Sequence, residues 1–507
     1  MSNNPLTKKS ALDSAKRILS ENKVIVLFII LCTACILISG VELSYVAGEV
    51  ATRFGRNTCL VLALIIPCLA GLGMNFGITV GAIAAQIPVF FVIHWGFTGV
   101  SAMLLCVLLA TPLAVFFGYL VGKVYNATKG AEMIAGLVLG FFCDGLYRLF
   151  TLYLIGGVIP YDDPNLLPRG FGLRNSFDLT GKMKYVIDDI SFLTTLTVIS
   201  AVAIAATLVI GIHGRKVGRP VDKKQRVSKL LAYTGVLVFS IAANFIPFLK
   251  ATLGGSRLIL ANAIALGGMA VIAYAVVMLA IRRPALKSAA FKKYVKLGVI
   301  AGILMAVNCI PAVNKVFAAT RISSFAYAII CLFCFFNNWI LSTRLGQNMR
   351  TVGQSRSVAT SAGIDVDKTR IIATCISTVL ASWGQLIFLQ NLGTFNSVMQ
   401  QSSVGLYAVA AILVGGANVQ KANNKQAVLG VLLFHTLFVV APLAATKLVG
   451  DSAVSEYIRM FISYGVIAVS LAMHASKSSG RRKPDAEGMT AVMIRPVDPG
   501  STSQDVH

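Results

Sequence analysis

A polar, basic run interrupts an otherwise apolar sequence from Thr351 to Ile371, and it reads TVGQSRSVATSAGIDVDKTRI. Its residues suit a short amphipathic helix that could seat in a groove of a partner protein. Gly363 then allows a tight turn that would return the chain to the next apolar segment. The residue types in this run therefore favour a protein contact over catalysis.

A second pair of chemically capable residues, Asp144 and Arg148, stands in the apolar segment CDGLYR. Charges at membrane depth are costly unless they are paired or face the interior of a bundle. The i, i+4 spacing puts both on one helix face, where they partly neutralise each other. A structural ion pair and a pair that lines a transport route both fit this pattern.

Glycines and an asparagine break the apolar run from Gly71 to Gln86, GLGMNFGITVGAIAAQ. Unwound backbone at membrane depth is tolerated only where protein covers it or where it lines a wet cavity. Broken helices commonly border substrate routes, although the stretch also fits a tight turn or a helix-packing face. Scattered amides likewise fit bonds between helices or contact with a polar solute. Our candidate route residues are Asn75, Gly77, Gln86, Asp144 and Gln390.

Motifs for nucleotide, metal and nucleophile chemistry are missing from the sequence. There is no phosphate loop of the GxxxxGKS/T type and no credible nucleophile arrangement. No His/Glu motif has metal-ligand spacing, and the CxxC pairs Cys32/Cys35 and Cys331/Cys334 lack two further ligands nearby. We therefore expect no metal, no cofactor and no enzymatic activity, only a transporter subunit without its own nucleotide-binding site.

The composition indicates which elements must position these residues. Of the 507 residues, 56% are hydrophobic and 13% are charged, against about a quarter charged in soluble domains. About fourteen apolar stretches are long enough to cross a bilayer, the first beginning near Val24 and the second near Thr58. We expect an all-α polytopic membrane protein with about 10–14 transmembrane helices, at least one of them broken or re-entrant. They form one membrane domain at residues 24–474.

Basic residues set the expected direction of the spans. Roughly thirty of the 45 Lys and Arg fall on one side when the spans alternate, and the positive-inside rule makes that side cytoplasmic. It receives a basic arm at 1–23 and a polar, aperiodic tail at 475–507, for which we expect disorder. We thus expect a multi-pass protein of the cell membrane with both termini cytoplasmic. Because the net charge of +25 sits in short loops, nucleic-acid binding is not expected.

From Gly346 onward, GQNMRTVGQSRSVATSAGIDVDKTRIIATCISTVLASWGQLIF resembles the cytoplasmic coupling region of one family of transporter subunits. These are permeases of ABC importers for ribose-like sugars, nucleosides and branched-chain amino acids. In that family a short helix ends in a turn of the type small residue-Gly-Ile-Asn/Asp. A basic residue follows the turn, and the chain then re-enters the membrane. The matching residues are Ala359, Ser361, Ala362, Gly363, Ile364, Asp365, Lys368 and Arg370. The resemblance implies a cytoplasmic coupling segment at 351–370, with Arg356, Ala359, Gly363, Ile364 and Asp365 as the residues that couple the permease to an ATPase.

Two further segments resemble this family in the same order. They are the glycine-punctuated run from Gly71 to Gln86 and the stretch from Val404 to Leu432, which contains AILVGG. Family members usually have fewer spans than the number counted here. The surplus lies at 191–322, which we interpret as a possible insertion of extra spans.

The resemblance implies a permease subunit of an ATP-driven importer for a small polar solute. AEMIAGLVLGFF, from Ala131 to Phe142, resembles the nucleoside branch more than the sugar branch, and both solute classes stay open. The implied partners are cytoplasmic ABC ATPase subunits, a second permease subunit, identical or different, an extracytoplasmic substrate-binding protein and the lipid bilayer. The alternatives are a secondary transporter or flippase driven by an ion gradient, in which Asp144 and Arg148 would couple the ion, and a non-transporting scaffold.

Overall fold

The computed structural model describes residues 23–160, 166–167, 172–216, 223–282, 288–398, 400–418, 421–451 and 453–479. Within these ranges, eight helices are long and apolar enough to cross a membrane, and up to ten if each bent helix pair counts as one span. Three shorter apolar helices lie at residues 23–39, 78–94 and 400–414. The predicted fold class, an all-α polytopic membrane protein with broken segments, is confirmed. Residues 1–22 and 480–507, and with them most of the predicted arm and tail, lie outside the described ranges.

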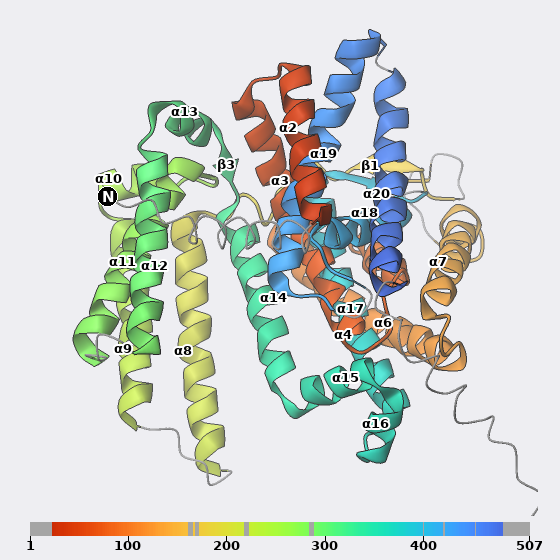
Figure 1. Cartoon of the computed structure of the whole chain (residues 1–507), viewed down its shortest axis with the longest axis horizontal. Helices are drawn as coiled ribbons and strands as arrows, with labels where there is room; N and C mark the ends of the chain where they lie inside the picture. Colours follow the sequence, from red (N-terminus) through yellow and green to blue (C-terminus); the bar gives the residue numbers. More distant parts are fainter. Residues whose placement is uncertain are drawn as a thin grey trace, which may run out of the picture.

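The main bundle is built from the two ends of the chain (Figure 1). Its first half contains α2 (Lys23–Ser39), α3 (Leu43–Ala63), α4 (Ile65–Leu69), α5 (Ile78–His94), α6 (Gly99–Ala127), α7 (Glu132–Leu149) and the π-helix η1 (Phe150–Leu154). Its second half contains α14 (Ser324–Ser342), α15 (Arg344–Gln354), α16 (Arg356–Ser361), α17 (Val366–Leu392), α18 (Gln400–Val414), α19 (Asn424–Val449) and α20 (Ala453–Ser479).

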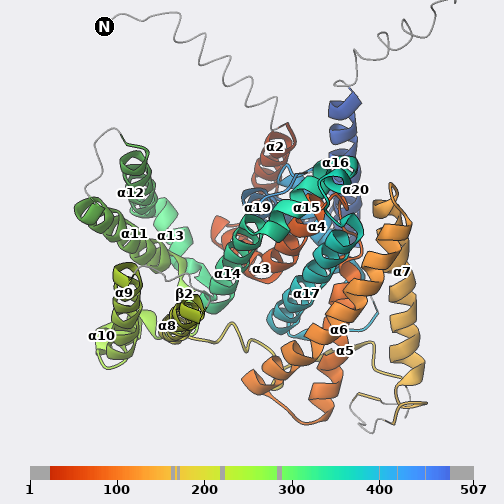
Figure 2. The ribbon, with the colours of Figure 1, turned by 90° about the horizontal axis from the view of Figure 1, so that it is seen from below.

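The middle of the chain forms a second helical group beside this bundle (Figures 1 and 2). It contains α8 (Phe192–Lys216), α9 (Lys223–Ala243), α10 (Pro247–Leu253), α11 (Leu260–Arg282), α12 (Ala289–Asn308) and α13 (Pro311–Ala319). Here α8 packs with α9 and α11 with α12, whereas α13 contacts α3 and α14 contacts α8. The chain bends by 102° between α9 and α10 and by 90° between α12 and α13. Each bend is followed by a proline at the first position of the new helix, where its missing N–H costs no hydrogen bond.

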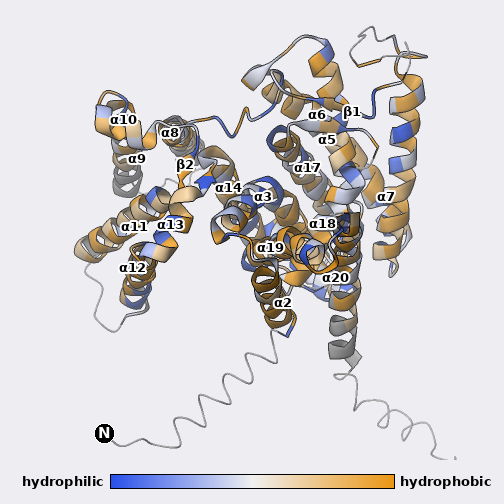
Figure 3. Ribbon diagram, turned by 90° about the horizontal axis from the view of Figure 1, so that it is seen from above, coloured by the Kyte–Doolittle hydropathy of each residue, from blue (hydrophilic) through white to orange (hydrophobic). Residues whose placement is uncertain are grey.

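Most of the second group's apolar surface is exposed. Only 6% of the α11 window and 17% of the α8 window are buried inside the protein, and Figure 3 shows hydrophobic residues along these helices. Such helices suit a lipid environment. The region predicted as extra spans, 191–322, is thus helical and apolar, and its origin as an insertion stays a prediction.

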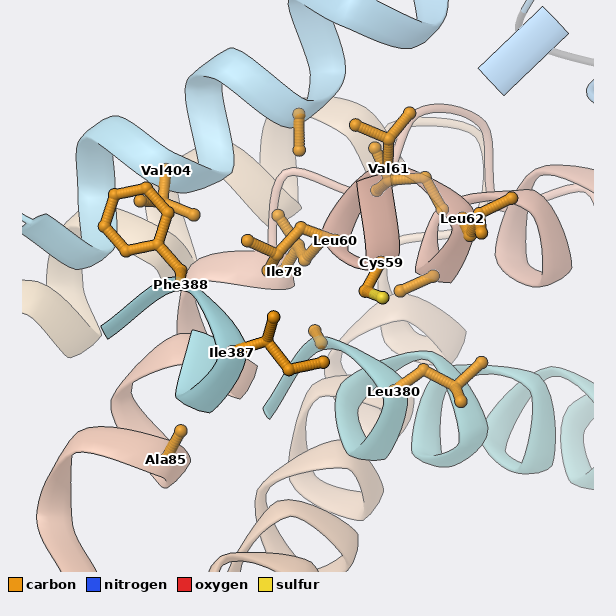
Figure 4. Packing of buried hydrophobic residues seen from close by; sticks show 14 of the residues in the cluster. Cys59, Leu60, Val61, Leu62, Ile78, Ala85, Leu380, Ile387, Phe388 and Val404 are labelled. Carbon is orange, nitrogen blue, oxygen red and sulfur yellow. The ribbon is translucent and has the colours of Figure 1, made fainter. Parts of the chain in front are cut away.

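Helix α17 lies at the centre of the main bundle, against α3, α5 and α6. Glycines allow this close approach: a Cβ at Gly81 of α5 would lie 2.8 Å from Ala381 Cβ, and one at Gly384 would lie 2.9 Å from Leu60 Cγ. Figure 4 shows Leu60, Leu380 and Ile387 in the resulting core. Because lipid supplies no hydrophobic drive between helices, such small-residue contacts hold a membrane bundle together.

The break expected between Gly71 and Gln86 is shorter than the glycines suggested. Helix α4 ends at Leu69 and α5 already begins at Ile78, with Gly71 and Gly73 at positive φ in between. The second span differs as well, because α3 begins at Leu43 and not near Thr58. Its first turns carry charged residues, which hide a span from hydropathy.

Two short pairs of strands, each joining segments far apart in the sequence, lie at the end of the bundle away from α16. Strand β1 (Ser176–Asp178) pairs with β4 (Thr394–Asn396), and β2 (Leu258–Ile259) pairs with β3 (Arg321–Ile322), both antiparallel. Phe177 and Phe395 stack with ring centroids 4.7 Å apart across the first pair. This pairing ties the long loop before α8 to the end of α17.

We predict that Gly81→Ala destabilises the fold whereas Gly145→Ala does not. The new methyl at position 81 would lie 2.8 Å from the Thr378 carbonyl oxygen, while the one at position 145 would meet nothing within 4 Å. Overpacking of this kind costs about 1–3 kcal/mol, and both changes gain the same helix propensity. The measurement is the apparent melting temperature in detergent. Equal melting temperatures for the two variants would contradict the close α5–α17 contact.

Candidate functional site

The turn between α16 and α17 is closed by two consecutive caps. Gly363 has φ +75°, its N–H donates to the Thr360 carbonyl, and the Ile364 N–H donates to the Ala359 carbonyl over 3.0 Å. This is the Schellman pattern, which requires a left-handed residue after the helix. Asp365 then caps α17 by accepting a hydrogen bond from the Lys368 N–H at 2.9 Å. Gly363, Ile364 and Asp365 therefore each contribute a local hydrogen bond or backbone conformation that lets the chain reverse direction here.

Helix α15 lies on the break between α4 and α5. Its apolar side buries Met349 and Val352, and a Cβ at Gly353 would collide with the Leu69 carbonyl oxygen. In α16, Ala359 is buried while Val358 is 59% exposed. The polar run from Thr351 to Ile371 thus comprises the end of α15, all of α16 and the first turns of α17. Helices α15 and α16 each bury one face and expose another.

Glu132, at the start of α7, joins α16 to α17 through one carboxylate. Its Oε1 accepts from Arg370 Nη2 at 2.5 Å and forms an ion pair with Arg356 as well. Arg370 is fully buried and also donates to the Tyr125 carbonyl at 3.2 Å. Its Nε and Nη1 have no hydrogen-bond partner. A buried guanidinium in this setting depends on its carboxylate, because an unpaired buried charge is strongly destabilising.

A cavity of about 540 Å³ lies beside this ion network. Its walls come from the α4–α5 break, the start of α7 and the α15–α16 junction, with Gly71, Gly130, Glu132, Gly353 and Arg356 among the lining residues. The predicted coupling segment therefore borders a cavity at its Val352–Arg356 end and is not packed on all sides.

Asn75 and Gly77 lie at the same end as α16. Asn75 Oδ1 accepts from the Tyr125 hydroxyl at 2.6 Å, and its Nδ2 is 3.4 Å from Ser377 Oγ. A Cβ at Gly77 would lie 2.6 Å from the Tyr125 hydroxyl oxygen. These residues hold the α4–α5 break against α6 and α17, so their present contacts are packing contacts.

Gln86 and Gln390 lie farther along the bundle and do not contact each other. Gln86 is fully buried, with Nε2 3.5 Å from Gln400 Oε1 and no partner for its own Oε1. Gln390 bonds Asp188 Oδ2 at 3.3 Å and accepts from the Ile187 N–H at 3.2 Å. The predicted route residues thus form separate groups from one end of the bundle to the other.

Asp144 has two partners in the bundle. Arg148 Nη2 lies 2.7 Å from its Oδ2, and Gln401 Nε2 donates to its Oδ1 at 2.5 Å. The predicted i, i+4 ion pair is therefore formed, with the carboxylate held against α18 by an amide. Among the described residues, no group of three or more His, Cys, Asp or Glu side chains is placed to hold a metal ion.

Comparison with known proteins decides the family. The family model described as branched-chain amino acid transport system / permease component matches residues 190–471, more than half of the 507 residues. The chain belongs to this permease family. The resemblance inferred from the coupling segment is thereby confirmed, and the protein is a multi-pass membrane subunit of a transport system.

A curated relative supports the same class. The permease is 25% identical over 184 residues to the nucleoside ABC transporter permease protein NupC of Lactococcus lactis subsp. cremoris, covering 36% of this chain and 55% of NupC. The permease thus spans about half the length of the curated relative it matches. No solved structure matches the permease.

Sequence reasoning missed two groups of charged residues in the permease. Glu132 lies in a segment quoted only for its resemblance, and its pairing with Arg370 joins positions too far apart in sequence for any local pattern to reveal. The second group is Glu49, Arg53 and Arg56, which α3 carries inside a candidate span. Their i, i+4, i+7 spacing on one helix face was the available signal.

We predict that Glu132→Gln lowers the stability of the permease by about 3–5 kcal/mol, because it leaves Arg370 buried without a counter-charge. Adding Arg370→Met should restore most of that loss, since removing both charges is far less costly than removing one. The control is Glu42→Gln, whose exposed carboxylate is 3.9 Å from Lys315. The measurement is the apparent melting temperature in detergent. Additive losses in the double variant would contradict the proposed ion network.

Proposed function

We propose that this permease is the membrane subunit of an ATP-driven ABC importer for a small polar solute, with a nucleoside or a simple sugar as the favoured class. A separate subunit hydrolyses the ATP, because the permease has no phosphate loop. The observation that carries the proposal is the α15–α16 segment with its double-capped turn. It offers a short exposed helix to a partner and is tied to α7 and α17 through Glu132.

The proposed orientation places the α16 end in the cytoplasm of the cell, together with both termini. The basic residues of the segments that flank α16 and of the sequence between α8 and α9 favour that side. Two ATPase subunits would dock there, one on each of two permeases, identical or different. An extracytoplasmic binding protein would deliver solute at the opposite end, where β1 and β4 pair.

Transport follows from a difference in affinity. Closure of the ATPase pair on ATP moves Val358 and its neighbours in α16, and the ion network passes the displacement to α7 and α17. ATP shifts the permease between its inward-open and outward-open states only to the extent that the ATPases bind those states with different affinity. In this scheme Arg356, Ala359, Gly363, Ile364 and Asp365 couple, and Asn75, Gly77, Gln86, Asp144 and Gln390 border the route.

A gradient-driven transporter is the second candidate, and it rests on Asp144 with its Arg148 and Gln401 contacts. Intramembrane carboxylates of this kind serve as proton or ion relays. That function would leave the α15–α16 segment without a partner, and it predicts transport by the permease alone under an ion gradient.

The proposal predicts that Gly363→Val abolishes ATP-driven uptake while Gly363→Asn retains most of it. Both side chains enter open space, because a Cβ at this position meets nothing within 4 Å. They differ in backbone preference, since asparagine tolerates φ +75° and a β-branched residue does not. The measurement is solute uptake by the native host, with recovery of a co-purifying ATPase on the tagged permease.

The control is Gly145→Val, which changes a helix position with an equally open Cβ. Intact uptake in Gly363→Val, or a permease that never recovers an ATPase, would contradict the proposed coupling segment.

A further inference from the structure

Two arginines of α3 lie partly buried in the main bundle. At 1.5 Å per residue, Arg53 is about 15 Å and Arg56 about 20 Å along the helix from Leu43, and Arg56 contacts Phe388, four residues before α17 ends at Leu392. Helix α3 faces α17, α18 and α19 there. Intramembrane arginines that face a bundle interior mark substrate or ion routes more often than structural sites.

Only one of these arginines has a carboxylate partner. Arg53 Nε lies 3.4 Å from Glu49 Oε2 on its own helix. Arg56 makes no ion pair within 4.0 Å with any carboxylate in the described part of the chain, and its buried Nε has no hydrogen-bond partner. Its Nε–H is therefore available to a ligand, while Glu49 and Asp188 act on the guanidinium from beyond ion-pair distance.

Aromatic rings cover both guanidinium groups. Arg56 lies 5.2 Å from the ring centroid of Phe388 on α17, and Arg53 lies 5.4 Å from that of Phe438 on α19. Figure 4 shows Phe388 beside Val404 of α18. His435, one turn from Phe438 and with its ring 6.2 Å away, is buried with no partner on Nδ1. We call Arg53, Arg56, Phe388, Phe438 and His435 the cation–aromatic cluster.

This combination of groups suits a flat ring that carries hydrogen-bond acceptors. Guanidinium groups donate in a rigid fork that matches paired acceptors on a base edge, and a base stacks on an aromatic face or on the guanidinium plane. A simple sugar has no aromatic π face to stack on a ring or on a guanidinium plane. A zwitterionic amino acid would need a carboxylate free to pair with its ammonium group. Glu49 is already paired with Arg53, and the buried Asp188 accepts from the side-chain amides of Gln390 and Asn391.

We infer that the cation–aromatic cluster is a recognition site for an aromatic solute of the nucleobase type along the transport route. The inference rests on the proposed import function and narrows its solute class to nucleosides. The ring stacks on Phe388, and Arg56 donates to its acceptors in place of the present contact between the two side chains. Arg53 keeps 20% of its side chain accessible.

The test compares Phe388→Leu with Phe388→Tyr in the native host, using radiolabelled adenosine and uridine as probes and ribose as the solute without a base. Leucine keeps an apolar side chain but removes the ring face, whereas tyrosine keeps the face. We expect Phe388→Leu to lower nucleoside uptake about tenfold, Phe388→Tyr to stay near wild type, and ribose not to compete. The matched control is Phe335→Leu on α14, where Phe335 is 66% exposed.

Substitutions of Arg56 provide a second test. Arg56→Lys keeps the charge but loses the fork, so we expect it to lose nucleoside uptake as Arg56→Gln does. Full uptake in Arg56→Lys would assign the residue to charge balance and overturn its role as a donor to the ring.

The inference fails if wild type carries ribose or leucine and no nucleoside, or if the leucine and tyrosine variants at position 388 transport equally. Recovery of the ATPase on each tagged variant separates this failure from failure of the import function. A wild-type permease that recovers no ATPase contradicts the import function. The effect of the Phe388 variants on nucleoside uptake can be measured whether ATP or an ion gradient drives that uptake.

Discussion

The shared carboxylate of Glu132 is the interaction on which the α16 end of the bundle depends. Arg370 is fully enclosed, and its guanidinium cannot be deprotonated at accessible pH. Its position inside the protein therefore requires a counter-charge, and the same oxygen that provides it also holds Arg356 of α16. The start of α7, the exposed helix and the central helix α17 are thus joined at one point.

Close backbone packing links α17, which the Glu132 network holds at one end, to α5 and α6 along its length. Glycines of α5 and α6 face α17 at distances that a larger side chain would not permit, so the three helices have little freedom to slide separately. A displacement of α16 can be transmitted into the bundle through two connections, the ion network of Glu132 and the start of α17. Densely packed interiors transmit such displacements instead of absorbing them. This explains how a six-residue helix at the surface can bear on polar groups deep in the bundle.

Local patterns in the sequence were enough for the parts of the permease that depend on neighbouring residues. Hydropathy predicted a polytopic helical protein, and the Ala-Gly-Ile-Asp run predicted the turn after α16, because a left-handed glycine and an N-cap act within a few residues. Contacts between distant segments had no such signal. The Glu132–Arg370 pair joins α7 to α17, and the Arg56–Phe388 contact joins α3 to α17. The start of α3 was missed for a related reason, since charges that the bundle interior shelters look like loop residues to a hydropathy average.

The most direct measurement of the central claim uses the purified permease in proteoliposomes, with and without the ATPase that co-purifies with it. Solute uptake and ATP hydrolysis are recorded together, first with ATP on the α16 side and then with a proton gradient alone. The account predicts uptake that requires both the ATPase and ATP on that side, at a fixed ratio of solute to ATP. Uptake by the permease alone under the gradient would contradict it and would make Asp144 the centre of a gradient-driven mechanism.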